Sequence, residues 1–339
     1  MKASLSRDLV QNAMREAFPA AEVRVADFYG MQEYHLGWRD AQFRPTYADP
    51  GKLLRPLFCL LSCDAVGGDP HQALPLAAGI QLMHDFSLIH DDIEDQSDTR
   101  RGRATVWTKW GLAQGINTGD GMLIVSHLSL HRLVEVGVRP EVALEVLRRF
   151  DQTVLSVCEG QYLDIAYEGN LAINEDDYIA MISRKTAALI AAATELGALV
   201  GRADVETTQA MFDFGHNLGL AFQIEDDVLG IWGDPEETGK PPAADLLRRK
   251  LSLPVIHALR ATEQHDALAR LYTKPATEAG DINAMLELLE QAGSQRYAEQ
   301  MAEQYHNRAM AALDLVHKGN PQALAEMRRI AKDLLNRRT

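Results

Sequence analysis

Apolar residues recur at intervals of three and four along most of the chain, and strictly alternating apolar and polar runs are absent. The first pattern is typical of amphipathic helices, whereas alternation would indicate strands. We therefore expect an all-α protein. The predicted helices cover residues 4–17, 52–66, 71–95, 104–113, 118–137, 139–168, 174–201 and 205–232, with shorter helices towards the C-terminus.

The main breaks between these helices carry turn residues. They fall at Gly67-Gly68-Asp69-Pro70 and from Gly233 to Pro242. Neither break is long enough to separate two cores, so we expect one domain over residues 1–339, a bundle of roughly ten or more helices. Several helices are rich in Ala, Leu, Ile and Gly, which indicates either burial on most sides or the lining of a deep central cavity.

The composition of the chain excludes some classes of function. The chain has 34 Lys and Arg against 48 Asp and Glu, a net charge of −14, which argues against a nucleic-acid partner. A small phosphorylated substrate stays compatible with that charge, because metal ions can reverse the local sign. Three cysteines, Cys59, Cys63 and Cys158, predict no disulfide framework. With no signal peptide and no apolar stretch long enough for stable membrane insertion, we expect a cytoplasmic protein.

The first candidate site is the segment LIHDDIEDQSDTRRGR, Leu88–Arg103. Asp91 and Asp95 are four residues apart, so both carboxylates leave one helix face, where like charges repel each other. Divalent cations such as Mg²⁺ would remove that penalty, and the following Arg100 and Arg101 suit phosphate oxygens. Taken alone, the segment could equally be a solvated acidic helix end followed by a basic loop.

A second acidic helix end favours the metal interpretation. Glu225-Asp226-Asp227 closes an apolar helix, and Lys240, Asp245 and Arg248-Arg249-Lys250 follow. Two such helix ends, each followed by cations, are typical of a site where several Mg²⁺ ions hold a diphosphate between facing helices. A third acidic run, 174–177, precedes an apolar helix, where it is expected to cap the first turn and not to bind metal.

With these segments in view, the chain resembles the trans-isoprenyl diphosphate synthases of the polyprenyl synthetase family. The resemblance covers Gly51 to Pro254 and rests on seven segments in the family's order. They are GKLLRP (51–56), LIHDDIEDQSDTRRG (88–102), GQYLD (160–164), SRKTAAL (183–189), FQIEDD (222–227), GDPEETGK (233–240) and RKLSLP (249–254).

The resemblance implies a role for each matching position. Asp91 and Asp95, supported by Asp92, would bind two Mg²⁺ ions, and Asp226 would bind a third beside Asp227. Four residues match ligands of the isopentenyl diphosphate: Lys52, Arg55, His84 and Arg101. Six match positions around the allylic diphosphate: Arg100, Lys185, Thr186, Gln223, Lys240 and Lys250. The implied catalytic group is Asp91, Asp92, Asp95, Arg100, Lys185 and Asp226.

Three positions depart from the family pattern. Gly230 stands where the second motif usually has a further aspartate, Trp107 replaces a common histidine, and Leu53 replaces a basic residue. None of the three belongs to the charged set inferred above. We therefore expect activity to survive, with one anchor of the second motif weakened.

The reaction that the resemblance implies is Mg²⁺-dependent condensation of isopentenyl diphosphate with an allylic diphosphate, in a homodimer. The expected product is geranylgeranyl diphosphate (C20), with farnesyl diphosphate (C15) as the alternative. Related enzymes with an aromatic residue five positions before the first aspartate and a small residue four before it make C20, and Phe86 and Ser87 hold these positions. Met83 lies about one helical turn further along, at the expected floor of the tail cavity.

Three other functions compete with this one. A class I terpene cyclase normally has an Asn/Ser/Glu triad in place of Asp226-Asp227, and would not need the isopentenyl-diphosphate set. A metal phosphohydrolase, prompted by His84-Asp85 and His90-Asp91, would need further His and Asp ligands. A non-catalytic partner subunit typically loses one aspartate motif, whereas this chain keeps both.

Overall fold

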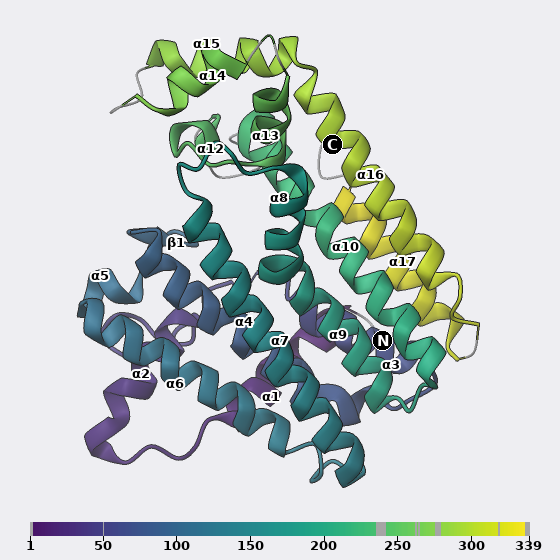
Figure 1. Ribbon diagram of the computed structural model, residues 1–339. Helices are drawn as coiled ribbons and strands as arrows, with labels where there is room; N and C mark the ends of the chain where they lie inside the picture. The colour runs from purple at the N-terminus through teal and green to yellow at the C-terminus, as the bar shows by residue number, and fades with distance from the viewer. Residues whose placement is uncertain are drawn as a thin grey trace. The chain divides into compact units, whose positions relative to one another are not determined.

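The computed structural model describes residues 3–49, 51–234, 242–261, 263, 265–274, 279–317 and 319–335. Almost all regular structure in these residues is helical, as the apolar spacing predicts, and the only sheet within them is one short hairpin (Figure 1). The residues divide into two compact units, which are described separately. The first takes its residues from 1–151, 193–208 and 318–323, and the second from 152–192, 209–317 and 324–339.

The first unit is built around one long apolar helix, α4, which packs against α1, α3 and α6. Its helices are α1 (Ala3–Ala17), η1 (Val23–Val25), α2 (Ala26–His35), α3 (Leu54–Ala65), η2 (Pro70–Ala73), α4 (Leu74–Glu94), α5 (Val106–Trp110) and α6 (Leu112–His131). Strands β1 (Thr99–Arg100) and β2 (Arg103–Ala104) form the hairpin. Gly79 allows α4 and α6 to approach closely, because a Cβ there would lie 2.1 Å from Leu130 Cδ1. This packing fixes the helix that carries the first aspartate motif.

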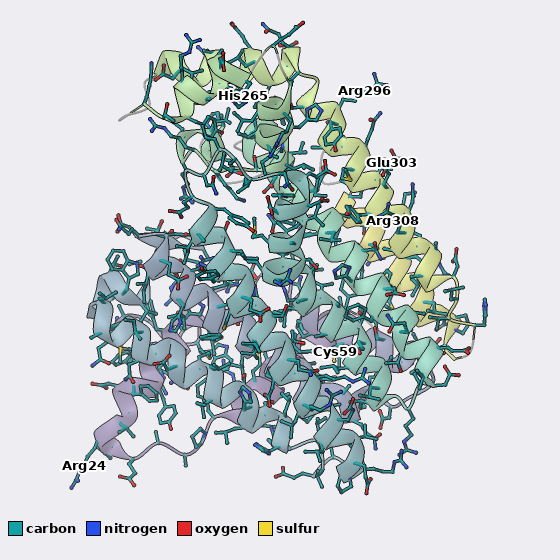
Figure 2. All side chains as sticks on the ribbon, in the orientation of Figure 1. Arg24, Cys59, His265, Arg296, Glu303 and Arg308 are labelled. Carbon is teal, nitrogen blue, oxygen red and sulfur yellow. The ribbon has the colours of Figure 1, made fainter. Side chains whose placement is uncertain are left out.

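The second unit has its own apolar core, which includes Tyr178, Ile224 and Leu253. Its shorter elements are α8 (Glu175–Ile182), η3 (Ser183–Ala187), α12 (Ala244–Leu247), α13 (Leu253–Arg260), α14 (His265–Tyr272), α15 (Ala279–Gln291) and α16 (Ser294–Leu313). The boundary between the units falls within α7 (Pro140–Tyr167), α9 (Ala188–Val200), α10 (Val205–Trp232) and α17 (Pro321–Leu335). Helix α16 packs on α13, while the labelled Arg296, Glu303 and Arg308 point outward (Figure 2).

The helix boundaries show where sequence patterns succeed and fail. The acidic run at 174–177 is a helix start, as expected: Asn174 and Asp177 form a reciprocal capping box. Residues 26–35 form a helix that the pattern did not predict, because α2 carries its apolar residues without a clear one-sided stripe. The helix predicted from 118 begins at Leu112, and the one predicted over 174–201 contains a π-helical turn.

Two further expectations concern cysteines and membranes. Cys59 and Cys63 are buried and Cys158 is exposed, and all three are free thiols; Figure 2 labels Cys59. In the described part of the chain, no helix combines the length and the apolar character needed to cross a bilayer.

Candidate active site

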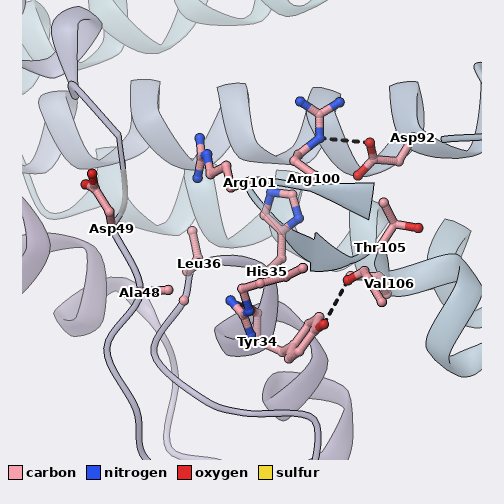
Figure 3. A pocket seen from close by; sticks show the side chains of 13 residues that line it. Tyr34, His35, Leu36, Ala48, Asp49, Asp92, Arg100, Arg101, Thr105 and Val106 are labelled. Carbon is pink, nitrogen blue, oxygen red and sulfur yellow. Dashed lines mark hydrogen bonds and ion pairs between the residues drawn. The ribbon is translucent and has the colours of Figure 1, made fainter. Parts of the chain in front are cut away.

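The first acidic helix end lies at the C-terminus of α4, followed by the hairpin. Asp92 is 2% exposed, and its Oδ1 accepts a hydrogen bond from Arg100 Nε at 2.8 Å (Figure 3). Burial raises the pKa of Asp92, and the charge of Arg100 opposes that rise. Asp91 is partly buried and Asp95 is exposed. Arg100 therefore fixes the buried carboxylate, Asp92, which lies on the same helical turn as Asp91 and Asp95, the two expected metal ligands.

The hairpin presents the two arginines by a tight turn. Thr99 pairs with Ala104 and Arg100 with Arg103, so Arg101 and Gly102 form a two-residue connection. Both have positive φ, 51° and 72°, as a type I′ turn requires. A non-glycine residue at positive φ carries a strain of about 1–3 kcal/mol, and the surrounding structure must hold it there. Because Arg100 lies on β1 and Arg101 lies in the turn, the two side chains pair with different carboxylates: Arg100 with Asp92 and Arg101 with Asp85.

The expected isopentenyl-diphosphate residues also gather in the first unit. Arg55 Nη1, on α3, lies 3.3 Å from His84 Nε2, on α4, and this contact links the two helices. Burial and the charge of Arg55 hold the pKa of His84 well below its usual value, so the neutral ring accepts from the guanidinium. A Cβ at Gly51 would lie 3.9 Å from Arg101 Nη2, so the chain just before the exposed Lys52 runs beside Arg101.

A pocket adjoins this cluster. Arg100, Arg101 and Asp92 line it together with His35, and Figure 3 shows these side chains around the same space. The remaining lining includes Leu36, Ala48, Asp49 and Val106. His35 comes from the helix that the sequence pattern missed, and no motif pointed to it.

In the second unit, a π-helical turn positions Lys185. The turn, Ser183–Ala187, interrupts the helix that leads from α8 into α9, and such single turns occur frequently at functional sites. Lys185 Nζ donates to Asp164 of α7 in a close ion pair. Gly160 permits this approach, since a Cβ there would lie 2.2 Å from the Lys185 backbone nitrogen. The GQYLD segment thus supplies both the contact space and the counter-charge for Lys185.

Asp227 is the centre of a buried network at the end of α10. Its side chain is 1% exposed and accepts from Tyr178 Oη at 2.7 Å, Lys250 Nζ at 2.9 Å and Gln223 Nε2 at 3.2 Å. Thr186 Oγ1 donates in turn to Gln223 Oε1 at 2.7 Å. Desolvation opposes the charged form of Lys250, but the carboxylates of Asp227 and Asp245 outweigh it and raise the pKa above its ordinary value. Lys250 therefore stays cationic.

The space beside Gly230 is already filled. A Cβ at this position would lie 2.3 Å from Asp245 Oδ2, and Asp245 is 8% exposed. An aspartate at position 230 would therefore place a second carboxylate against a buried one. The other two departures are also accommodated: Trp107 Nε1 donates to Ser97 O at 2.9 Å, and Leu53 is buried in a left-handed conformation before α3.

The residues expected to set product length lie along α4. Met83 is fully buried, and Phe86 is 7% exposed with its ring edge-on to His90 at 4.9 Å between centroids. Ser87 Oγ donates to His84 O at 2.8 Å. The three side chains thus follow one another along the helix that ends in the first aspartate motif.

The structure thus brings the predicted residues together within each unit. The first holds Arg55 with His84 and Arg100 with Asp92; the second holds Lys185, Thr186, Gln223 and Lys250 near α10, where Asp226 is partly buried. Lys240 lies outside the described residues. Sequence reasoning gave Asp164, Tyr178, Asp85 and His35 no role in the condensation, and Asp85 entered only through the phosphohydrolase alternative. Only Asp164 had a signal, its place in the GQYLD segment.

The donor chemistry fits magnesium. Among the residues that the structure describes, no three His, Cys, Asp or Glu side chains come close enough to hold a metal ion by themselves. Mg²⁺ usually binds through one or two carboxylates, with substrate phosphates and water completing its shell. The carboxylates of Asp91, Asp92 and Asp95 at the end of α4, beside Arg100, are of the oxygen-donor type that Mg²⁺ prefers.

Comparison with known proteins gives one consistent family. The polyprenyl synthetase family model matches residues 38–289. The chain is 39% identical over 333 residues to a geranylgeranyl diphosphate synthase of Mycobacterium tuberculosis, covering 96% of this chain and 94% of that protein. It is 37% identical over 311 residues to a (2E,6E)-farnesyl diphosphate synthase of Mycobacterium bovis, covering 90% and 84%. A crystal structure of polyprenyl synthetase from Streptomyces coelicolor has a TM-score of 0.88 at 34% identity, covering 98% of both chains.

The contact at Gly160 generates a prediction about stability. Gly160→Ala should lower the stability of the protein by about 1–3 kcal/mol, because the added methyl overpacks the Lys185 backbone. Gly280→Ala is the matched control: a Cβ at this helical glycine meets nothing within 4 Å, so alanine should stabilise the helix. Urea unfolding followed by circular dichroism measures both. Equal stability changes for the two variants would show that the close approach at Gly160 is absent.

Proposed function

Because the chain belongs to the polyprenyl synthetase family, we propose that it condenses isopentenyl diphosphate with an allylic diphosphate to make a short-chain all-trans prenyl diphosphate. Geranylgeranyl diphosphate is the proposed main product and farnesyl diphosphate the alternative. Both units belong to one synthase domain in this proposal, since the family match takes residues from each. The proposed enzyme acts in the cytoplasm.

One observation carries the proposal: each aspartate motif lies at a helix end beside its own set of diphosphate-binding cations. Arg55 and Arg101 lie beside His84 and Asp85 of α4, the helix that ends in the first motif. Lys250 pairs with Asp227 of the second motif, and Lys185 pairs with Asp164 in the same unit. Two separate sets of cations suit two diphosphate substrates. A terpene cyclase binds one diphosphate and would need only one set.

The proposed metal ligands are Asp91, Asp95 and Asp226, holding about three Mg²⁺ ions. When bound, the ions neutralise the allylic diphosphate so that its carbon–oxygen bond can break. Arg100 and Lys185 are the residues proposed to donate to phosphate oxygens of the allylic diphosphate. Lys250 remains charged beside Asp227, and Lys185 pairs with Asp164.

The chain's other residues orient the second substrate. Lys52, Arg55 and Arg101 hold the diphosphate of isopentenyl diphosphate, and neutral His84 accepts from Arg55 and fixes it. The double bond then attacks the allylic cation, and loss of a proton completes a product five carbons longer. The departing pyrophosphate is the proposed proton acceptor. An apolar lining that includes Phe86 and Met83 would exclude water from the cation.

The metal clamp generates the first functional prediction. Asp91→Ala and Asp226→Ala should each lower turnover by at least about a hundredfold, since each removes charge stabilisation of the leaving group. Each should also weaken the rise in melting temperature that Mg²⁺ with pyrophosphate gives the unaltered protein. Turnover assays and thermal melts, with circular dichroism as the folding check, measure these effects.

Asp176→Ala is the control for these variants, because Asp176 is an exposed carboxylate in the helix-capping run. It should keep both the activity and the metal-dependent melting shift. Activity within a few-fold of wild type for Asp91→Ala or Asp226→Ala would contradict the metal clamp.

Product length depends on the residues before Asp91 in this proposal. Phe86→Ala should open space below the growing tail and shift the products beyond C20, whereas Ser87→Phe should shorten them to C15. One helical turn, 5.4 Å, is close to the length of one isoprene unit, so a single substitution changes length by about one unit. Chromatography of the dephosphorylated products measures the shift. If both variants keep the wild-type distribution, another helix forms the floor.

We also propose a homodimer, supported by an exposed apolar stripe on α6. Leu112, Ile116, Ile124 and Leu128 are 55%, 44%, 60% and 39% exposed, and their spacing in multiples of four makes a stripe that winds around the helix by about 40° for every four residues. A contiguous exposed apolar face is typical of a protein interface. A second copy of the chain is the occupant that the family resemblance implies.

The dimer proposal predicts the effect of a charge on this stripe. Ile124→Glu should convert a dimer into a monomer, because the buried carboxylate would lack a partner. Leu315→Glu, at a 64% exposed leucine beyond α16, is the control and should leave the mass unchanged. Size-exclusion chromatography with light scattering measures the mass. A wild-type protein of single-chain mass would contradict the dimer.

A further inference from the structure

Asp85 is a buried carboxylate to which the family resemblance gives no role, although His84-Asp85 prompted the phosphohydrolase alternative. It lies on α4, six residues before Asp91, and is 2% exposed. Its Oδ2 accepts a hydrogen bond from Gln81 Nε2 at 2.8 Å, and Gln81 is 3% exposed. Its Oδ1 lies 3.4 Å from His35 Nε2 and 3.8 Å from Arg101 Nη1. Three different elements, α2, α4 and the hairpin, therefore meet at one carboxylate.

This carboxylate is charged in the folded protein. Burial alone would raise its pKa, but the nearby His35 ring and the charge of Arg101 outweigh burial, so the pKa of Asp85 falls to about 2. The neighbouring His84 does not neutralise it, because burial and Arg55 hold the pKa of that imidazole well below its usual value. A buried anion is stable only beside a cation. Arg101 is the permanent cation at this position.

The two arginines of the hairpin meet their carboxylates in different ways. Arg100 donates a hydrogen bond to Asp92 at 2.8 Å, so one of its donors is occupied. Arg101 lies 3.8 Å from Asp85, which is within ion-pair distance but beyond hydrogen-bond distance. Asp85 can therefore attract and orient the Arg101 guanidinium without using the N–H donors that a phosphate would need. The side chain of Arg101 remains 35% exposed, so a ligand can reach its guanidinium group.

Orientation matters here because Arg101 occupies the tip of a two-residue turn at positive φ. Its Nη1 lies 3.8 Å from Asp85 Oδ1, and its Nη2 would lie 3.9 Å from a Cβ at Gly51, the residue before Lys52. A carboxylate behind the arginine thus fixes the direction in which its fork points.

We propose that Asp85, held in place by His35 and Gln81, is a positioning residue that orients Arg101 towards the diphosphate of isopentenyl diphosphate. This inference rests on the proposed function, which gives Arg101 that ligand. It adds a specific consequence: Asp85 and His35 affect the isopentenyl substrate selectively, although neither touches it.

Asp85→Asn tests the proposal, since it removes the charge and keeps the shape. The KM for isopentenyl diphosphate should rise about tenfold, the loss expected when a charge-assisted hydrogen bond is misaligned. The KM for the allylic diphosphate and kcat should stay within a few-fold of wild type. Steady-state kinetics with each substrate varied in turn give the three values, and thermal melts confirm folding.

A double-mutant cycle shows whether Asp85 acts through Arg101. In an Arg101→Ala background, Asp85→Asn should change the KM for isopentenyl diphosphate less than twofold, because the residue that it orients is gone. The control is Asp151→Asn, which alters an exposed carboxylate paired with His127 at 2.8 Å and should change neither KM. Equal effects of Asp85→Asn in both backgrounds would overturn the proposal.

The histidine provides a second test should Asp85→Asn fail to fold. His35→Leu should raise the same KM, and His35→Gln, which keeps a donor near Asp85, should restore most of the affinity. A KM for isopentenyl diphosphate that is unchanged or lower in these variants would overturn the positioning role while leaving the proposed function intact. Absence of condensation by the wild-type enzyme would instead overturn the proposed function, and this inference with it.

Discussion

A carboxylate removed from water must have a cation beside it, and the candidate site is arranged around that requirement. Asp85, Asp92 and Asp227 are each no more than 2% exposed, and each lies within ion-pair distance of an arginine or lysine. Breaking such a pair from one side leaves a buried charge, which is strongly unfavourable. The cations are therefore fixed before any substrate arrives.

The same requirement explains the local backbone. Arg100 and Arg101 reach different carboxylates only because the chain reverses at Arg101-Gly102, at the cost of a positive φ at an arginine. Lys185 reaches Asp164 from a π-helical turn, opposite a glycine that admits its backbone. At these two places, irregular backbone positions a charged side chain.

Sequence reasoning predicted the helical class and most helix positions, and it singled out the two acidic helix ends with their following cations. It succeeded for α10 and the capped start of α8 because apolar spacing and capping chemistry are local properties. It missed α2, whose pattern is weakly amphipathic, and with it His35. It also could not find Asp85 or Tyr178, because burial and contacts across many residues determine their partners. Gly230 looked like a lost anchor in the sequence, whereas the structure shows that Asp245 fills the space beside it.

The central claim is that two sets of cations serve two diphosphates in a condensation reaction. The most direct test supplies isotopically labelled isopentenyl diphosphate and unlabelled geranyl diphosphate to the wild-type protein with Mg²⁺, and follows the label by chromatography and mass spectrometry after dephosphorylation. We expect labelled geranylgeraniol, or labelled farnesol if the product is C15, formed only when both diphosphates are present. Geraniol or a cyclic hydrocarbon as the sole product, with no label incorporated, would contradict the condensation.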